Sequence, residues 1–435
     1  MLCDDRLSHP MVGFGRLRFS GHLDRNALEA AFSEALPRHV LLRCSIQRNR
    51  RGRPVWIEHT DWNPGVEWCT ANGEREFPQS SRADIGNAPG TRLWAIDRGP
   101  GHDLILQVHH CAADATGISQ VMEDLLIGYA LRRGGAPDVA VLPPMDTQRL
   151  QRRGTPGLTP LRWLGMAHRQ AVGLLGVREF LSRRPVPLMG TKVPFDESSP
   201  PESFPCPRIV ELEAEETGRL LAVAKTLGAT VNDLLMRDLF LALTAWRAEL
   251  SLGSDQDWLR VTVPMNLRTP ADVCMPMANS VSMVFADRRG MDASDPSILL
   301  DGICRQMNLI KKCRLQYTFL ASLAAARRLP GGLASRTRAE VVQSTSCFSN
   351  IGVALARTPL PRREGRLVAG DVELESVDFV IPLRPHLHGA FCAYTYAGRL
   401  RILLHHDPRA MADDLAEGLL DRFLRQIRQT LAAGR

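Results

Sequence analysis

Two adjacent histidines, His109 and His110, end an apolar stretch in the segment LILQVHHCAADATG at 104–117, and Asp114 follows four residues after His110. An imidazole with an unperturbed pKa of about 6.5 can accept and return a proton near neutral pH. The residues at 111–113 are small and leave space beside the rings. These residue types at this spacing predict a general base at the end of a strand.

Only one of the two histidines is expected to enter a cavity. Side chains alternate between the two faces of a strand, so His109 and His110 at the end of HDLILQVHH project in opposite directions. Asp114 stands just before an amphipathic segment at 116–133 that predicts a helix. Its carboxylate can cap that helix or bind a distant arginine, and either role would fix the loop that carries His110.

Other interpretations of these residues remain open. Both histidines could be core residues with satisfied hydrogen bonds. Cys111 could be a nucleophile, although the role of a small buried side chain that fills space fits its apolar neighbours better. A second pair, His405–His406, is followed directly by Asp407 and stands before a predicted surface turn. It lacks the three-residue spacing of the first pair.

A metal site is not expected. The stretch HLH at 386–388 offers two possible zinc ligands, but no third ligand stands at a convincing spacing. The 10 cysteines are scattered and form no C-x-x-C pair. That pattern favours reduced thiols in a cytoplasmic protein.

Composition and charge narrow the possible partners. Hydrophobic residues make up 44% and charged residues 23% of 435 residues, which is typical of a globular protein. The net charge of +7 favours acidic partners, including a phosphate-bearing substrate. The densest basic cluster, RNRRGR at 48–53, resembles a hairpin turn, and no nucleic-acid-binding motif accompanies it. The sequence has no apolar run of membrane-spanning length and no signal peptide pattern, which predicts a cytoplasmic protein.

The pattern of elements predicts an α/β protein with two similar lobes. Residues 1–150 alternate strands and helices, including a strand at 15–21 and a helix capped by Asp24. Residues 151–207 are rich in proline and glycine, contain one helical stretch and read as a crossover linker. Residues 208–435 repeat the α/β order of the first part, which indicates a second lobe of related design.

The segment HHCAADA resembles the H-H-x-x-x-D-G motif of the chloramphenicol acetyltransferase-like superfamily, which includes condensation domains and wax ester synthases. Five further stretches resemble the family in the right order, over nearly the whole chain. They are GHLDRNALEAAFSEALPRHVLLR, GATVNDLLMRDLFLAL, VPMNLR at 263–268, FSNIG at 348–352 and YAGRLRILLHHDPRAM. The resemblance implies two chloramphenicol acetyltransferase-like lobes, each a mixed sheet with flanking helices, and an active-site channel between them.

The resemblance also implies roles for single residues. His110 corresponds to the general base, His109 to a structural histidine, and Asp114 to an aspartate that pairs with an arginine of the other half, for which Arg268 is the candidate. Ala115 replaces the motif glycine, and Gly117 follows as site support. If position 115 required a positive φ, alanine there would be strained by about 1 kcal/mol.

The activity implied is acyl transfer from a thioester to a hydroxyl acceptor, without a covalent enzyme intermediate or a tightly bound cofactor. The donor would be acyl-CoA or a phosphopantetheine arm, with an acyl or peptidyl carrier protein as a possible partner of a monomeric enzyme. A secondary metabolite or lipid alcohol would be the acceptor. Candidate oxyanion or substrate contacts are Ser344, Ser349 and Asn350. The alternatives are an amide-forming condensation enzyme, acting on an amine, and a non-catalytic module that recruits a carrier protein.

Overall fold

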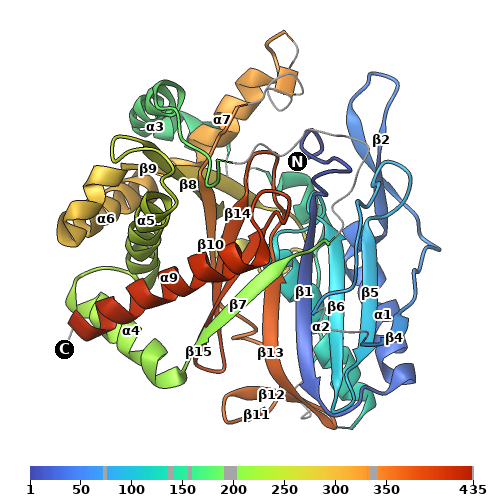
Figure 1. Cartoon of the computed structure of the whole chain (residues 1–435). Coiled ribbons are helices and arrows are strands. Elements are labelled where there is room, and N and C mark those ends of the chain that lie inside the picture. Colours follow the sequence, from blue (N-terminus) through green and yellow to red (C-terminus); the bar gives the residue numbers. More distant parts are fainter. Residues whose placement is uncertain are drawn as a thin grey trace.

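Two mixed sheets flanked by helices form the computed structural model of this chain (Figure 1). The structure describes residues 1–71, 76–134, 141–154, 159–190, 203–330, 332–333 and 341–433. The strands are β1 Val12–Ser20, β2 Cys44–Arg48, β3 Pro54–Glu58, β4 Glu67–Thr70, β5 Thr91–Asp97, β6 His102–His109, β7 Pro207–Leu212, β8 Trp258–Asn266, β9 Val281–Arg289, β10 Ser346–Val353, β11 Arg362–Arg363, β12 Arg366–Ala369, β13 Val372–Val380, β14 Gly389–Tyr396 and β15 Arg399–His406. The helices are α1 Arg25–Arg38, α2 Ala115–Arg132, α3 Pro160–Ser182, α4 Ala214–Thr226, α5 Val231–Glu249, α6 Pro296–Cys313, α7 Gln316–Ala326 and α9 Asp413–Ala433, with short 3₁₀ turns η1 Val40–Arg43, η2 Thr147–Arg152, η3 Pro270–Asp272 and η4 Gly290–Ser294.

The first sheet has the strand order β11-β12-β13-β1-β6-β5-β4. Strand β6 lies between β1 and β5, antiparallel to both, and every residue of HDLILQVH is buried. Helices α1 and α2 pack against each other, and α2 packs against β1. Because β6 is central and covered, its C-terminal end is held rigidly, and that is where the two histidines lie.

The second sheet has the order β7-β15-β14-β10-β8-β9. Helices α4, α5, α6 and α9 cover it, with α5 packed against each of the other three (Figure 1). Thr230 and Asp233 form a capping box that begins α5. A separate apolar cluster, which includes Leu239 and Phe423, fills the space between these helices and the sheet.

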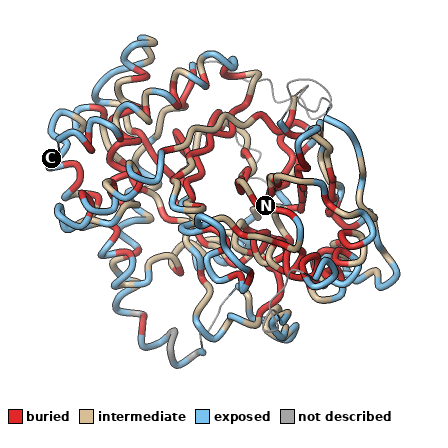
Figure 2. The backbone as a smooth tube through the Cα atoms, turned by 90° about the horizontal axis from the view of Figure 1, so that it is seen from below, coloured by how far each residue is buried: buried red, intermediate tan, exposed pale blue. Residues whose placement is uncertain are grey.

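Sheet pairing crosses the boundary expected at residue 208. Strand β13 comes from the C-terminal half of the chain but pairs antiparallel with β1, with Phe14 opposite Val380. The expected second lobe, 208–435, therefore supplies the strands that extend the first sheet. Figure 2 shows that buried residues run through the interior of the molecule, while exposed residues lie mainly at its outer rim.

A buried ion-pair network joins the sheets at this crossing. Arg16 of β1 contacts Asp378 of β13 at 2.6 Å, and the same carboxylate accepts hydrogen bonds from Tyr394 of β14 and Arg401 of β15. Arg16 and Asp378 are almost fully buried. Removing one member would leave a buried charge without its partner, so the network favours one fixed arrangement of the two lobes.

Sequence-based assignments were incomplete in several places. The apolar sequence VLLRCSIQ at 40–47 favours a single strand, but the segment begins with the 3₁₀ turn η1 before β2. The short strands β4, β11 and β12 were not foreseen. The proline- and serine-rich sequence at 190–207 is typical of an exposed turn, and most of it lies outside the described residues. Phe204 and Cys206, near its end, are buried. No helix among the described residues is both long and hydrophobic enough to cross a lipid bilayer.

Candidate active site

The two histidines have different surroundings. Strand β6 ends at His109, whose ring is completely buried and whose Nε2 lies 3.5 Å from Asp5 Oδ2. His110 begins the following turn and is partly exposed, while its backbone N–H still donates to the Met11 carbonyl at 2.7 Å. The strand therefore places the His109 ring fully in the core, whereas His110 is largely buried and keeps only partial contact with solvent.

A short hydrogen bond defines the tautomer of His110. Its Nδ1 lies 2.8 Å from the backbone oxygen of Ala113. A carbonyl oxygen only accepts, so Nδ1 must carry the hydrogen and donate it. In the neutral ring, Nε2 then has the free lone pair. The turn through Ala113 thus leaves Nε2 of the neutral ring as the nitrogen that can accept a proton.

Burial keeps this base neutral. Desolvation lowers the pKa of His110 to about 4, and the nearby Asp114 carboxylate opposes that shift only in part. At neutral pH the ring is therefore unprotonated and able to accept a proton.

We expect the acid limb of kcat/KM to fall near pH 4 rather than near 6.5. The pKa is lowered, so the neutral base is present above the folded-state value and is lost as pH falls through it. Initial rates measured from pH 4 to 8, with circular dichroism at each pH to confirm folding, test this. An acid limb at pH 6–7 in folded protein would contradict the burial of this ring.

The Asp114 carboxylate binds groups from both halves of the chain. One oxygen, Oδ1, accepts from the Gly117 N–H at 2.8 Å and caps α2. The other, Oδ2, accepts from Arg268 Nη1 at 2.7 Å and from the Ser280 N–H at 2.8 Å. Both expected uses of Asp114, as a helix cap and as an arginine partner, occur together. Arg268 also donates to the Ala278 carbonyl at 2.7 Å, which closes the network.

The alanine at the motif's glycine position is not strained. Ala115 is the first residue of α2, and it is not among the described residues with a positive φ. Gly117 has a clearer requirement. A Cβ at this position would lie 2.7 Å from the Ala278 carbonyl oxygen and 3.1 Å from the Ala278 nitrogen. The segment at 278–280 therefore packs directly on the backbone of the first turn of α2.

We expect Gly117→Ala to lower both thermal stability and activity. The added methyl would push Ala278 away and with it the contacts of Arg268 and Ser280 to Asp114. Gly165→Ala in α3 is the matched control, because a Cβ there meets no atom within 4 Å and alanine favours a helix. Equal melting temperatures for Gly117→Ala and wild type would refute the close approach.

Several supporting residues were not found from the sequence. Asn279 donates from Nδ2 to the His110 carbonyl at 2.6 Å and also contacts Met1 Sδ. Asp5, near His109, accepts from Arg82 at 2.7 Å. The first residues of the chain and the segment after β8 thus enclose the histidine turn. Nothing in their local sequence signals this role, because only the fold brings them to His110.

Cys111 is unsuited to nucleophilic attack. Burial raises the pKa of its thiol to about 11, so the thiolate is scarce at neutral pH. This favours the interpretation of Cys111 as a small filler beside the base.

Comparisons with known proteins agree with this architecture. No family model matches the sequence. An uncharacterized protein of Mycobacterium tuberculosis is 27% identical over 298 residues, which are 66% of this chain and 65% of that protein. The nonribosomal peptide synthetase agiA of Aspergillus flavus is 29% identical over 148 residues, 32% of this chain and 2% of the synthetase. This chain thus spans less than two thirds of the length of either relative.

Among solved structures, the first condensation domain of the calcium-dependent antibiotic synthetase superposes with a TM-score of 0.68 at 16% identity, covering 98% of this chain and 92% of that one. The chain has the condensation-domain fold. The SgcC5 protein from Streptomyces globisporus, solved with an aryl-substituted ethanediol and sucrose, gives a TM-score of 0.67 at 14% identity, covering 99% and 93% of the two chains. The expected two-lobed α/β architecture is thereby confirmed.

Within this condensation-domain fold, the three candidate oxyanion residues have hydrogen-bond partners or surroundings other than His110 in the part of the chain that the structure describes. The Ser344 hydroxyl is hydrogen-bonded to Thr262, and the Asn350 side chain accepts from the Gly352 N–H at 2.9 Å. Ser349 is partly buried in β10. No interaction found among the described residues joins any of the three to His110. Their roles as oxyanion or substrate contacts remain predictions.

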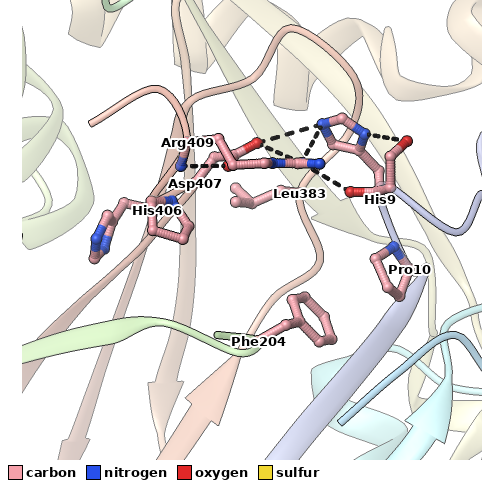
Figure 3. Close-up of a pocket in the computed structure, with 9 residues that line it drawn as sticks. His9, Pro10, Phe204, Leu383, His406, Asp407 and Arg409 are labelled. Carbon is pink, nitrogen blue, oxygen red and sulfur yellow. Dashed lines mark hydrogen bonds and ion pairs between the residues drawn. The ribbon is translucent and has the colours of Figure 1, made fainter. Parts of the chain in front are cut away.

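The second histidine pair is buried, and it precedes a turn in which Pro408 and Arg409 are partly exposed. His405, His406 and Asp407 are each at most 3% exposed. Asp407 accepts two hydrogen bonds from the Arg409 guanidinium, and its Oδ2 lies 3.6 Å from His9 Nε2 (Figure 3). The turn after β15 therefore contacts the start of the chain, and this contact helps to bury the Asp407 side chain.

A small cavity lies beside this contact, with a volume of about 250 Å³ including its opening to solvent. Figure 3 shows Pro10 and Phe204 on its lower side, below the His9, Asp407 and Arg409 cluster. Pro10 lies two residues before β1, whose first residue is paired with His109. The cavity therefore opens close to the backbone that supports the histidine turn.

Two groups of possible metal ligands come together in the described residues. They are His22, Asp97 and His102, and Cys206, His406 and Asp413. The HLH stretch belongs to neither. In the second group, Asp413 Oδ1 lies 3.0 Å and Cys206 Sγ 3.6 Å from His406 Nε2. Hydrogen bonds within this group account for its closeness without an ion.

Proposed function

We propose that this protein transfers an acyl group from a thioester to a hydroxyl acceptor, with His110 as the general base. The observation that carries the proposal is the Nδ1–H···O bond to Ala113, which leaves Nε2 of a partly exposed, neutral histidine as the acceptor. The condensation-domain fold and the relative that is a peptide synthetase support acyl transfer as the general class of reaction.

The reaction needs no covalent bond to the protein. Nε2 of His110 takes the proton of the acceptor hydroxyl as its oxygen attacks the thioester carbonyl carbon. The tetrahedral oxyanion then collapses, the carbon–sulfur bond breaks, and Nε2–H returns the proton to the leaving thiolate. An ester and a free thiol result, and His110 ends in its starting state. General-base catalysis of this kind contributes about 10²- to 10⁴-fold.

The surrounding residues position this base. The Asp114 carboxylate accepts hydrogen bonds from Arg268, Ser280 and Gly117, and these contacts hold the turn that carries His110. Because both carboxylate oxygens are used in this way, Asp114 does not act as the partner of a His–Asp dyad. Asn279 holds the His110 carbonyl. Holding the turn at both ends reduces the motion of the ring and so increases the time it spends in the reactive position.

A hydroxyl acceptor is favoured by the solved structure of SgcC5, which contains a diol. The relationship to a peptide synthetase favours an amine acceptor and amide formation as the second candidate. The donor in either case is acyl-CoA or an acyl group on phosphopantetheine of a carrier protein. Both donors carry phosphate, which suits the net charge of +7.

The test is product formation by purified protein. Acyl-CoAs and acyl-carrier thioesters of graded chain length are incubated with alcohols and amines, and products are identified by liquid chromatography and mass spectrometry. Ester from a hydroxyl acceptor, absent with His110→Ala, supports the proposal. Amide as the dominant product would favour the second candidate. Carrier-protein binding without any turnover would identify a non-catalytic module.

A further inference from the structure

Arg153 stands beside the histidine turn, at the C-terminal end of η2. Its carbonyl accepts a hydrogen bond from Ser280 Oγ at 2.9 Å, and the Ser280 N–H donates to Asp114. The backbone of Arg153 is therefore tied to the same segment that holds the base. Its side chain stacks over the Trp56 ring, with Cζ 4.9 Å from the ring centroid.

The guanidinium of Arg153 has no carboxylate partner among the described residues. The ionisable groups nearest to it are the thiols of Cys111 and Cys44, and burial lowers the pKa of Arg153. Other buried arginines are paired: Arg260 contacts Asp287, and Arg268 contacts Asp114, both at 2.7 Å. Cys111 directly follows His110, so this positive charge without a carboxylate partner lies near the histidine turn.

A partly desolvated guanidinium without a carboxylate partner is energetically unfavourable unless an anion forms an ion pair with it. Stacking on Trp56 uses the flat face of the group and leaves the N–H edge free, because the N–H bonds lie in the plane of the guanidinium. That edge can donate two parallel hydrogen bonds to a carboxylate or a phosphate. Arg153 is also partly exposed, so a ligand can reach it.

We propose that Arg153 binds an anionic oxygen group, carboxylate or phosphate, of a substrate that lies next to His110. The inference rests on the proposed function, because it assigns the anion to one of the two reactants. A phosphate would belong to the phosphopantetheine arm of the donor, and a carboxylate to the acceptor. In either case Arg153 is a binding residue that sets the position of the substrate and leaves proton transfer to His110.

Calorimetric titration of the full chain tests this without turnover. The donor arm compares 4′-phosphopantetheine with pantetheine, and the acceptor arm compares 3-hydroxybutyrate with its methyl ester. In one arm, wild type should prefer the anion about 10- to 100-fold, as expected for a charge-assisted bidentate contact. Arg153→Gln should abolish that preference, and Arg153→Lys should retain part of it. The arm that responds identifies the source of the anion.

The neighbouring exposed Arg152→Gln is the matched control and should bind like wild type. His110→Ala should also keep the preference, because binding does not need the base. Equal binding of the anionic and neutral probes by wild type, or an unchanged preference in Arg153→Gln, overturns the inference. Failure of the proposed function would appear separately, as absence of product in a protein whose anion preference is intact.

Discussion

Replacing His110 with alanine is expected to lower kcat by about 10²- to 10⁴-fold, the usual contribution of a general base. The acceptor hydroxyl would have to attack without losing its proton to Nε2, and the thiol would leave as an anion. Substrate binding should change little, because Nε2 acts on the transferred proton and the ring is only one wall of the site. Steady-state rates with saturating donor and acceptor measure the effect.

The fold should survive this substitution. His110 is partly exposed, and its side chain makes one described hydrogen bond, to Ala113. Its loss is worth about 1 kcal/mol. Cys111→Ser is the matched control in the same turn, and near-wild-type rates are expected for it because the thiol is not the nucleophile. A His110→Ala protein that turns over as fast as wild type would eliminate His110 as the base.

Arg268→Ala should have the second-largest effect, on stability as well as on rate. It removes the guanidinium from a carboxylate that is 2% exposed and leaves Asp114 with two backbone N–H groups. Breaking one side of a buried ion pair costs about 3–5 kcal/mol. The Ala278 carbonyl would also lose its hydrogen bond from Arg268, which weakens the support of the loop that carries His110, so kcat should fall together with the melting temperature. Denaturant unfolding and initial rates measure both effects.

Two control variants distinguish the effect of losing the Asp114–Arg268 ion pair from the effect of removing one positive charge. Arg305→Ala removes an arginine whose Asp301 contact at 3.8 Å is largely solvent-exposed, and little change is expected. The double variant Asp114→Asn with Arg268→Ala should recover part of the lost stability, because the uncompensated carboxylate is gone. An Arg268→Ala protein with unchanged stability and rate would show that the contact at 2.7 Å does not hold the loop.

The Asp114–Arg268 contact shows why the two halves of the chain form one site. The partners are 154 positions apart in sequence. Asn279 and Ser280 reach the histidine turn from the same C-terminal segment, and β13 extends the sheet that supports it. His110 thus stands on the first lobe, while much of what orients its turn comes from the second half of the chain.

Local patterns predicted most of the long elements. The alternation of HDLILQVHH predicted β6, and the apolar spacing at 116–133 predicted α2. In a strand or a long helix, the spacing of apolar residues along the sequence shows which face is buried. Short strands such as β4 and β12 have too few residues to show a period. The burial of His405 and His406 was also missed, because it depends on residues distant in sequence, such as Phe204 beside His405 and Cys206 beside His406.

The sequence by itself determined the order of elements, the position of His110 at a strand end and the candidate partners Asp114 and Arg268. Periodicity and residue type are local properties, so they can be read along the chain. Only the tertiary structure decided the tautomer of His110 and its lowered pKa. Both depend on the Ala113 carbonyl and on the atoms that exclude water from the ring. The unpaired charge of Arg153 was likewise visible only in space, since pairing depends on which carboxylates the fold brings within reach.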